Sequence, residues 1–161
     1  MNKIRKITVL FMVVIMTLIL CSCGTKGSKV KDYEGFYTTT YTTSSGMTTY
    51  HEAMIIDKKG NVKYGSVSGY YTQTVFEGTM EIENDKGVFY CSDSWGYRKE
   101  WINEFPFTLT LLNDGEKLNG IFTGDLGARN FTKVSEEELK TFCEENEVFI
   151  SIDELKESRN Q

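Results

Sequence analysis

Few residues in this sequence are suited to catalysis or metal binding. Its single histidine, His51, lies within Thr49-Tyr50-His51-Glu52. A histidine metal site or a histidine general base needs partners of matching type, and there is no second histidine to form a cluster. The usual nucleotide, metalloprotease and serine-hydrolase motifs do not occur after residue 22. The sequence therefore favours a protein that is not an enzyme and holds no metal or cofactor, with His51 at the surface or rim of the fold.

Two cysteines, Cys91 and Cys143, lie in the part of the chain that follows residue 32. Cys91 falls near the end of a predicted strand, and Cys143 falls on the apolar stripe of a predicted helix. In an exported chain two such thiols can pair and join the helix to the sheet. Buried reduced thiols are the alternative, because cysteine packs as a small hydrophobic residue. The sequence leaves both interpretations open.

Aromatic side chains are the best candidates for contact with a ligand or a partner. The five candidates are Tyr70, Tyr71, Trp95, Tyr97 and Trp101. Trp95 precedes a glycine, which is typical of a loop tip, where a tryptophan can stack on a sugar ring or anchor an interface. Trp101 fits better in the core or at a barrel mouth. Structural packing of the whole group is the alternative.

The segment that must position these residues, 33–134, has the pattern of an all-β domain. It is rich in Thr, Tyr, Phe, Ile and Val, and turn signals such as Asn84-Asp85-Lys86-Gly87 interrupt it at short intervals. Alternation places Leu109 and Leu111 on one strand face and Met80 and Ile82 on another. We predict an antiparallel meander of eight or nine strands in a small barrel or sandwich, near residues 34–43, 50–56, 61–67, 70–82, 87–92, 97–102, 105–112, 117–123 and 129–134.

After Val134 the pattern changes to that of one amphipathic helix. Ser135 and the three glutamates that follow it form an N-cap with an acidic first turn, which suits the free amides and the dipole at a helix start. Leu139, Phe142 and Cys143 then share a stripe that we expect to pack on the sheet. Within 135–161 the sequence predicts this helix first and then a frayed polar tail from residue 153.

The charge balance excludes several kinds of partner. The chain has 18 Lys and Arg against 23 Asp and Glu. Without residues 1–22, 15 basic and 23 acidic residues remain, a net charge near −8. Such a domain repels phosphate backbones and anionic headgroups, so nucleic acid is not an expected partner, and any membrane attachment must have another source.

The first 24 residues supply that source. Residues 1–6 are basic, residues 7–20 are an uncharged run of 14 residues, and Leu20-Cys21-Ser22-Cys23-Gly24 follows. The run is shorter than the roughly 20 apolar residues that span a bilayer and suits a secretory signal. The final stretch resembles the lipobox of bacterial lipoproteins, in which a leucine and a small residue precede an obligatory cysteine, here Cys23. An ordinary signal peptide or a short anchor helix is the alternative.

The resemblance to bacterial lipoproteins implies cleavage before Cys23, a diacylglyceryl group on its thiol and acylation, for example with palmitate, of the new amino terminus. Two or more acyl chains anchor a protein stably. We therefore expect a signal peptide at 1–22, a lipidated Cys23 with a flexible tether to residue 32, and attachment to the extracytoplasmic face of the cell membrane.

The domain itself is similar to the small lipocalin-like lipoproteins. The similarity lies in Gly35-Phe36-Tyr37 at the first strand, successive hairpins, and the closing run from Ala128 to Val134 before a helix. Lipocalins open with Gly-x-Trp and close with an arginine that packs over that tryptophan, whereas Tyr37 stands at the tryptophan position here. The resemblance implies an up-and-down barrel with a small apolar ligand inside.

Three functions remain open from the sequence. The first is a non-catalytic, membrane-anchored module that binds a small apolar ligand in a barrel or contacts an envelope component. The second is a protein-binding or inhibitor-like β-sandwich without a ligand cavity. The third is an enzyme with a carboxylate site.

The anchor can be tested with a Cys23→Ala variant. We expect the wild-type chain in the membrane fraction, beginning at a lipid-modified Cys23 by mass spectrometry, and the variant uncleaved. A soluble wild-type chain that begins at another residue would refute the lipobox interpretation.

Overall fold

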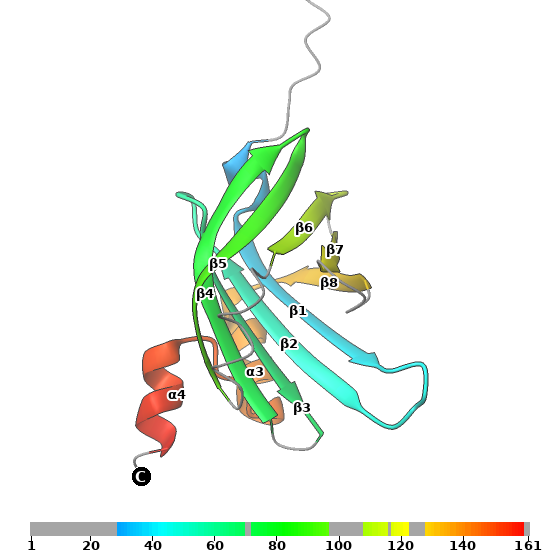
Figure 1. Ribbon diagram of the computed structural model, residues 1–161, viewed down its shortest axis with the longest axis vertical. Helices are drawn as coiled ribbons and strands as arrows, with labels where there is room; N and C mark the ends of the chain where they lie inside the picture. Colours follow the sequence, from blue (N-terminus) through cyan, green and yellow to red (C-terminus); the bar gives the residue numbers. More distant parts are fainter. Residues whose placement is uncertain (1–28, 70–71, 97–107, 116, 123–127, 160–161) are drawn as a thin grey trace, which may run out of the picture.

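The eight strands of this protein form a closed antiparallel barrel. The computed structural model describes residues 29–69, 72–96, 108–115, 117–122 and 128–159. Each strand pairs with its neighbours in the sequence, and the last pairs with the first (Figure 1). The strands are β1 (Gly35–Thr42), β2 (Thr49–Ile56), β3 (Asn61–Ser68), β4 (Thr72–Glu83), β5 (Lys86–Gly96), β6 (Thr108–Asn113), β7 (Lys117–Phe122) and β8 (Ala128–Val134). The all-β meander is confirmed, and it closes as a barrel.

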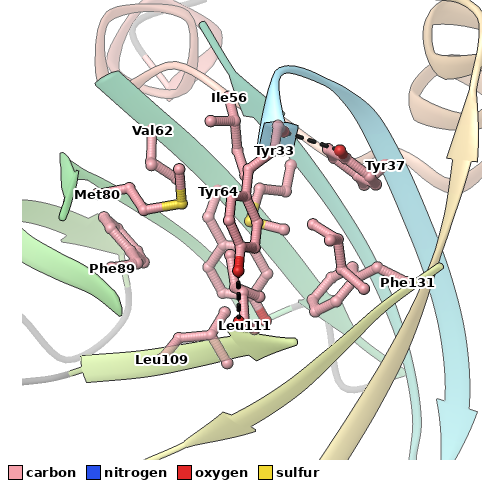
Figure 2. Packing of buried hydrophobic residues seen from close by; sticks show 12 residues of the cluster. Tyr33, Tyr37, Ile56, Val62, Tyr64, Met80, Phe89, Leu109, Leu111 and Phe131 are labelled. Carbon is pink, nitrogen blue, oxygen red and sulfur yellow. Dashed lines mark hydrogen bonds between the residues drawn. The ribbon is translucent and has the colours of Figure 1, made fainter. Parts of the chain in front are cut away.

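One end of the barrel is filled by side chains. Residues of alternate strand positions point inward and are at most 3% exposed; they include Tyr37, Met54, Ile56, Val62, Tyr64, Met80, Phe89, Leu109, Leu111, Leu118 and Phe131. Tyr33, at the end of the 3-10 turn η1 (Val30–Tyr33), lies among them. Its carbonyl accepts from the Tyr37 hydroxyl at 2.8 Å, and its hydroxyl donates to the Leu111 carbonyl at 3.4 Å (Figure 2). The same hydroxyl accepts from Gly87 N at 2.9 Å. The filled end is thus a packed hydrophobic core.

The tight turns form where the sequence predicts them. Asn84 and Asp85 both have positive φ, 49° and 63°, as the two central residues of a hairpin turn that matches strand twist require. At the β2–β3 turn, Asp57 Oδ1 accepts from Lys59 N at 2.7 Å and from Asn61 N at 2.9 Å. These local contacts fix the register of the hairpins.

The outer face of β2–β4 is apolar and is covered by the C-terminal part of the chain. Ala53 and Val67 pack with Leu139 and Val148, and Val75 packs with Ile152 and Leu155. Leu139 belongs to α3 (Glu136–Asn146), whose N-cap at Ser135 is confirmed: its hydroxyl accepts from Glu138 N at 3.2 Å. This helix lies outside the barrel (Figure 1).

The expected frayed tail after residue 153 is wrong, because a second helix, α4, spans Ile152–Arg159. Its start is held by Glu77, whose Oε1 accepts from Ile152 N at 3.1 Å. Ile152 and Leu155 are 5% and 2% exposed on the wall of the barrel. The polar majority of this segment concealed two apolar residues at helical spacing.

The predicted strand at 97–102, and the start of the one at 105–112, lie outside the described residues. The other predicted strands agree with the structure to within a few residues, apart from β5, which continues to Gly96 instead of ending near 92. The continuation follows a β-bulge, since Glu77 pairs with Asp93 but Gly78 pairs with Cys91.

Gly65 lets the segment between the helices lie directly on β3. A Cβ added there would be 2.0 Å from the Phe149 carbonyl oxygen. We expect Gly65→Ala to lower the free energy of unfolding in urea by about 1–3 kcal/mol, the usual range for overpacking. Gly69→Ala is the control, because its added Cβ would meet nothing nearer than 4.0 Å, and it should change stability by less than about 0.5 kcal/mol. Equal effects of the two changes would show that the segment does not pack on β3.

Candidate functional site

The interior of the barrel changes from apolar to polar along the strands. The pairing register sets inward-facing residues in rows, and the row of Ile56 and Val62 is followed by that of Tyr37, Met54 and Tyr64. The next two rows are polar: Thr39, Glu52, Ser66 and Thr74, then Tyr41 and Tyr50. We call these two polar rows, together with the partly exposed Phe76 in the row of Tyr64 and Cys91 in the row of Val62, the open half.

Partial exposure distinguishes the open half from the filled end. Tyr41, Tyr50, Ser66, Thr74, Phe76 and Cys91 are inward-facing in phase with core residues, yet each is partly exposed. Inward-facing side chains of a closed barrel meet solvent at its mouth, where Tyr41 and Tyr50 stand one residue from their strand ends, or where the interior is not filled. The open half is therefore the candidate functional site.

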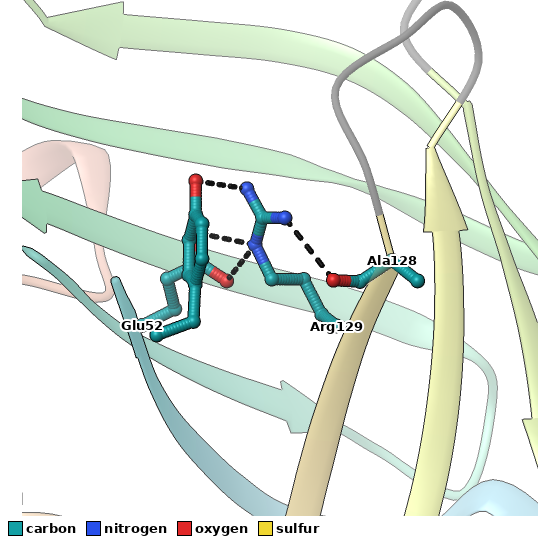
Figure 3. A network of polar contacts seen from close by, with 4 residues as sticks. Glu52, Ala128 and Arg129 are labelled. Atoms are coloured by element: carbon teal, nitrogen blue, oxygen red, sulfur yellow. Dashed lines mark hydrogen bonds and ion pairs between the residues drawn. The ribbon is translucent and has the colours of Figure 1, made fainter. Parts of the chain in front are cut away.

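An ion pair between Glu52 and Arg129 crosses this half of the barrel, from β2 to β8. Arg129 Nε lies 3.2 Å from both carboxylate oxygens of Glu52 (Figure 3). The two side chains are 2% and 7% exposed. Glu52 and Arg129 both occupy inward-facing strand positions, where a charge is unusual. The cost of desolvating each ion is offset only by its partner and by further hydrogen bonds.

Those further hydrogen bonds are present on the Glu52 side. The carboxylate also accepts from the side chains of Tyr64 and Ser66. Burial raises the pKa of Glu52, and Arg129, Tyr64 and Ser66 oppose that rise. Burial likewise raises the pKa of Tyr64 well above its usual range, so its hydroxyl remains a donor to the carboxylate.

Arg129 also binds an aromatic pair. Its guanidinium carbon lies 3.4 Å from the centroid of the Tyr41 ring, and its side chain donates to the Tyr41 hydroxyl. Another nitrogen donates to the Ala128 carbonyl at 3.2 Å. Tyr41 is stacked on Tyr50 with centroids 4.8 Å apart and planes at 11°. The ion pair, the stacked rings and the uncharged hydroxyls form one network.

The arginine of the closing strand is not placed as the lipocalin resemblance implies. Arg129 packs over Tyr41, whereas the cation nearest the Tyr37 ring is Lys133, with Nζ 5.8 Å from its centroid. Lys133 donates instead to the Glu34 carbonyl at 2.7 Å. The residue at the tryptophan position therefore belongs to the filled end.

Of the five aromatic candidates, Tyr70, Tyr71, Tyr97 and Trp101 lie outside the described residues. Trp95 is described, and its prediction as a loop tip is wrong, because β5 continues through it and pairs it with Val75. After the bulge its side chain falls on the outer face, where it packs against the cluster of Val75, Ile152 and Leu155. Trp95 is therefore a packing residue beneath α4 and does not line the open half.

Both cysteines are free thiols, so the structure does not contain the Cys91–Cys143 bridge that the sequence left open. Cys91 packs against the interior core, whereas Cys143 packs against the outer cluster of Ala53 and Leu139. The wall of the barrel lies between these two clusters. Burial raises the pKa of each thiol to about 11, which keeps both protonated and unreactive at neutral pH.

His51 lies on the outer face of β2. It is partly exposed, and its Nδ1 is 3.1 Å from Thr40 Oγ1 on the neighbouring strand. Among the described residues there is no cluster of three or more His, Cys, Asp or Glu side chains suited to a metal ion. None of the helices described is long and apolar enough to cross a membrane.

A groove on the outer surface runs between the two helices and the wall of the barrel. It has a volume of about 770 Å³ and an apolar floor that includes Phe36, Ile55 and Ile150. Glutamates stand along its rim, among them Glu136, Glu144, Glu147 and Glu154. This groove is separate from the barrel interior.

Glu52 is not among the predicted site residues, and the lipocalin resemblance places the closing arginine, Arg129, over Tyr37 and not against Glu52. A signal was present, because Glu52 is two residues before Met54 and Arg129 is two residues before Phe131, so each charge is in phase with a core position of its strand. A charge in phase with buried residues predicts that its side chain is buried and needs a partner, without saying which. The same alternation predicts that Tyr41, four residues after the buried Tyr37, also faces the interior.

No protein-family model, curated protein or solved structure matches the chain.

Arg129→Gln should make stability depend on pH. Arg129 holds down the pKa of Glu52, so its loss raises that pKa further above the unfolded value. A carboxyl with a raised folded pKa loses stability as pH rises through the window above its ordinary value. We expect a deficit of roughly 3–5 kcal/mol at pH 7 that shrinks toward pH 5. It would be measured by urea unfolding at both pH values.

The control for this experiment is the double variant Glu52→Gln/Arg129→Gln, which has no buried charge at the site. Its stability relative to the wild type should show no deficit that grows between pH 5 and pH 7. A deficit of Arg129→Gln that is the same at both pH values would contradict a buried, ionised Glu52.

Proposed function

We propose that this protein is a lipid-anchored, extracytoplasmic binding module that holds a small, largely apolar ligand in its barrel. The ligand lies in the open half, with its apolar body toward Phe76 and the filled end and its polar end among Tyr41, Tyr50 and the ion pair. An eight-stranded barrel has room for its own side chains or for one small ligand. In this barrel, side chains fill one end, and we propose that the ligand occupies the other.

The observation that carries this proposal is the exposure of inward-facing side chains in the open half. Phe76 and Cys91 face the interior in phase with the core and are nevertheless partly exposed, while Met80 and Phe89 on the same two strands are 3% and 0% exposed. Apolar side chains that face the barrel interior and are reached by water favour a ligand of matching character.

The membrane location in this proposal is supported by the sequence alone. The basic start, the 14-residue apolar run and the cysteine at position 23 occur in the order of a lipoprotein signal. With a net charge near −8 after residue 22, the domain has no electrostatic attraction to anionic lipid. Acyl chains on Cys23 would hold it at the membrane without such attraction.

Contact with an envelope protein is a second candidate, and the outer groove favours it. Its floor is apolar and its rim is acidic, so a polypeptide with apolar and basic side chains would complement it. The barrel interior, however, is the more distinctive feature, because the buried pair and the stacked tyrosines have no evident use in a purely packed core.

The proposal is tested with N-phenyl-1-naphthylamine, an uncharged apolar fluorophore, on the full chain in lipid nanodiscs. Empty nanodiscs give the background. We expect saturable binding of one fluorophore per chain. Thr74→Trp, which fills the open half, should weaken binding at least about tenfold, a loss of about 1.4 kcal/mol.

The matched control is Thr79→Trp, on the exposed outer face of the same strand, which should leave binding unchanged. Absence of saturable binding by the wild type, or equal loss in both variants, would contradict a ligand in the barrel.

A further inference from the structure

The described residues place one cation and one anion in the open half, and the two neutralise each other. Of the described side chains in its two polar rows and the facing part of β8, only Glu52 and Arg129 are charged. The others are the hydroxyl side chains of Thr39, Tyr41, Tyr50, Ser66, Ser68 and Thr74. The described side chains of the site are therefore polar and together have no net charge.

From this arrangement we propose that the ligand is an uncharged amphipathic molecule, with an apolar or aromatic body and a neutral polar end such as an amide, a hydroxyl or an ester. This inference rests on the proposed function and names the chemical class of its ligand.

An anionic ligand is disfavoured by Glu52. A carboxylate brought to the guanidinium would lie close to the Glu52 carboxylate, which already occupies Arg129 Nε at 3.2 Å through both oxygens. Two carboxylates near one guanidinium leave a net negative charge in a site where Glu52 is 2% exposed and cannot be screened by water. Arg129 is therefore not available to bind the carboxylate of a fatty acid.

A cationic ligand is disfavoured by Arg129, the other member of the ion pair. Arg129 covers the Tyr41 ring face at 3.4 Å, so that face already has a cation over it. A second cation would lie beside the guanidinium and would compete with it for Glu52.

A neutral polar group meets neither obstacle. Tyr41 and Tyr50 are partly exposed and have hydroxyls that both donate and accept. Their rings are stacked with planes at 11°, and the polar row of Thr39, Glu52, Ser66 and Thr74 lies between them and the partly exposed Phe76, so aromatic rings stand on both sides of that row. Hydrogen bonds to hydroxyls together with contact to rings suit an uncharged molecule with a flat or apolar body.

The test uses two probes that differ only in charge, 1-naphthaleneacetamide and 1-naphthaleneacetate. Each is titrated at pH 7.5 against the full chain in nanodiscs that already holds N-phenyl-1-naphthylamine, and its displacement is followed by fluorescence. We expect the acetamide to displace it at a concentration at least about tenfold lower than the acetate. This comparison needs no variant and so does not depend on a mutant that folds.

A charge variant then tests the cause. Glu52→Gln keeps an acceptor for Arg129 but removes the negative charge, so the order of the two probes should reverse. Glu81→Gln, on the exposed outer face of β4, is the matched control and should keep the wild-type order.

The outcomes separate the two proposals. If N-phenyl-1-naphthylamine does not bind, the proposed function fails. If it binds, and the acetate displaces it as well as the acetamide or neither probe displaces it, the ligand class inferred here is wrong while the barrel remains a binding site. A Glu52→Gln variant that folds and keeps the wild-type order would also overturn the inference.

Discussion

The rest of this structure depends on the pairing of the first strand with the last. Phe36, Tyr37 and Thr38 pair with Val134, Lys133 and Thr132, and this short ladder turns a meander into a barrel. Without it β1 and β8 would both be open edges. Closure also brings Arg129 of β8 across to Glu52 of β2, two residues that no local contact could hold together. The enclosed interior and its charged pair are thus two results of one set of hydrogen bonds.

The interior so enclosed has a filled end and an open half, and the two differ in what they contribute to stability. Its filled end buries large aromatic and aliphatic side chains almost completely, which is the main source of favourable free energy in a domain of this size. Its open half retains an ion pair whose desolvation is costly, and a hydrophobic replacement of such pairs is often neutral or stabilising. A charged pair in that position is therefore poorly explained by its contribution to folding, and the proposed function gives it a different role, the choice of ligand.

Much of this architecture follows from the sequence because strands and turns are local. Alternation in Met80 to Ile82 and Leu109 to Leu111, and the Asn84-Asp85 turn, fix strand faces and hairpins without knowledge of the rest of the chain. Closure as a barrel could not be chosen over a sandwich on that basis, because it depends on pairing between the two ends of the domain.

The predictions that were wrong depend, like barrel closure, on contacts between parts of the chain that are far apart in the sequence. Trp95 looked like a loop residue because it stands beside Gly96, but a bulge at the Glu77–Gly78 pair carries the strand past it, and α4 provides its cover. Ile152 and Leu155 had too few apolar neighbours to indicate a helix, since the barrel wall supplies their partners. Glu52 and Arg129 were recognisable from their phase, but their mutual contact was not.

The cover that α3 and α4 give to the outer wall has a consequence for how the chain is made. Ala53, Val67 and Val75 lie on β2, β3 and β4, whereas their partners Val148, Ile152 and Leu155 follow β8 in the chain and are made only after all eight strands. Until those residues are made, the outer wall is an apolar stripe in water, available to a chaperone or to a neighbouring nascent chain. Burial by the segment that follows β8 thus protects the outer wall from aggregation, and this role is separate from the open half on the other side of that wall.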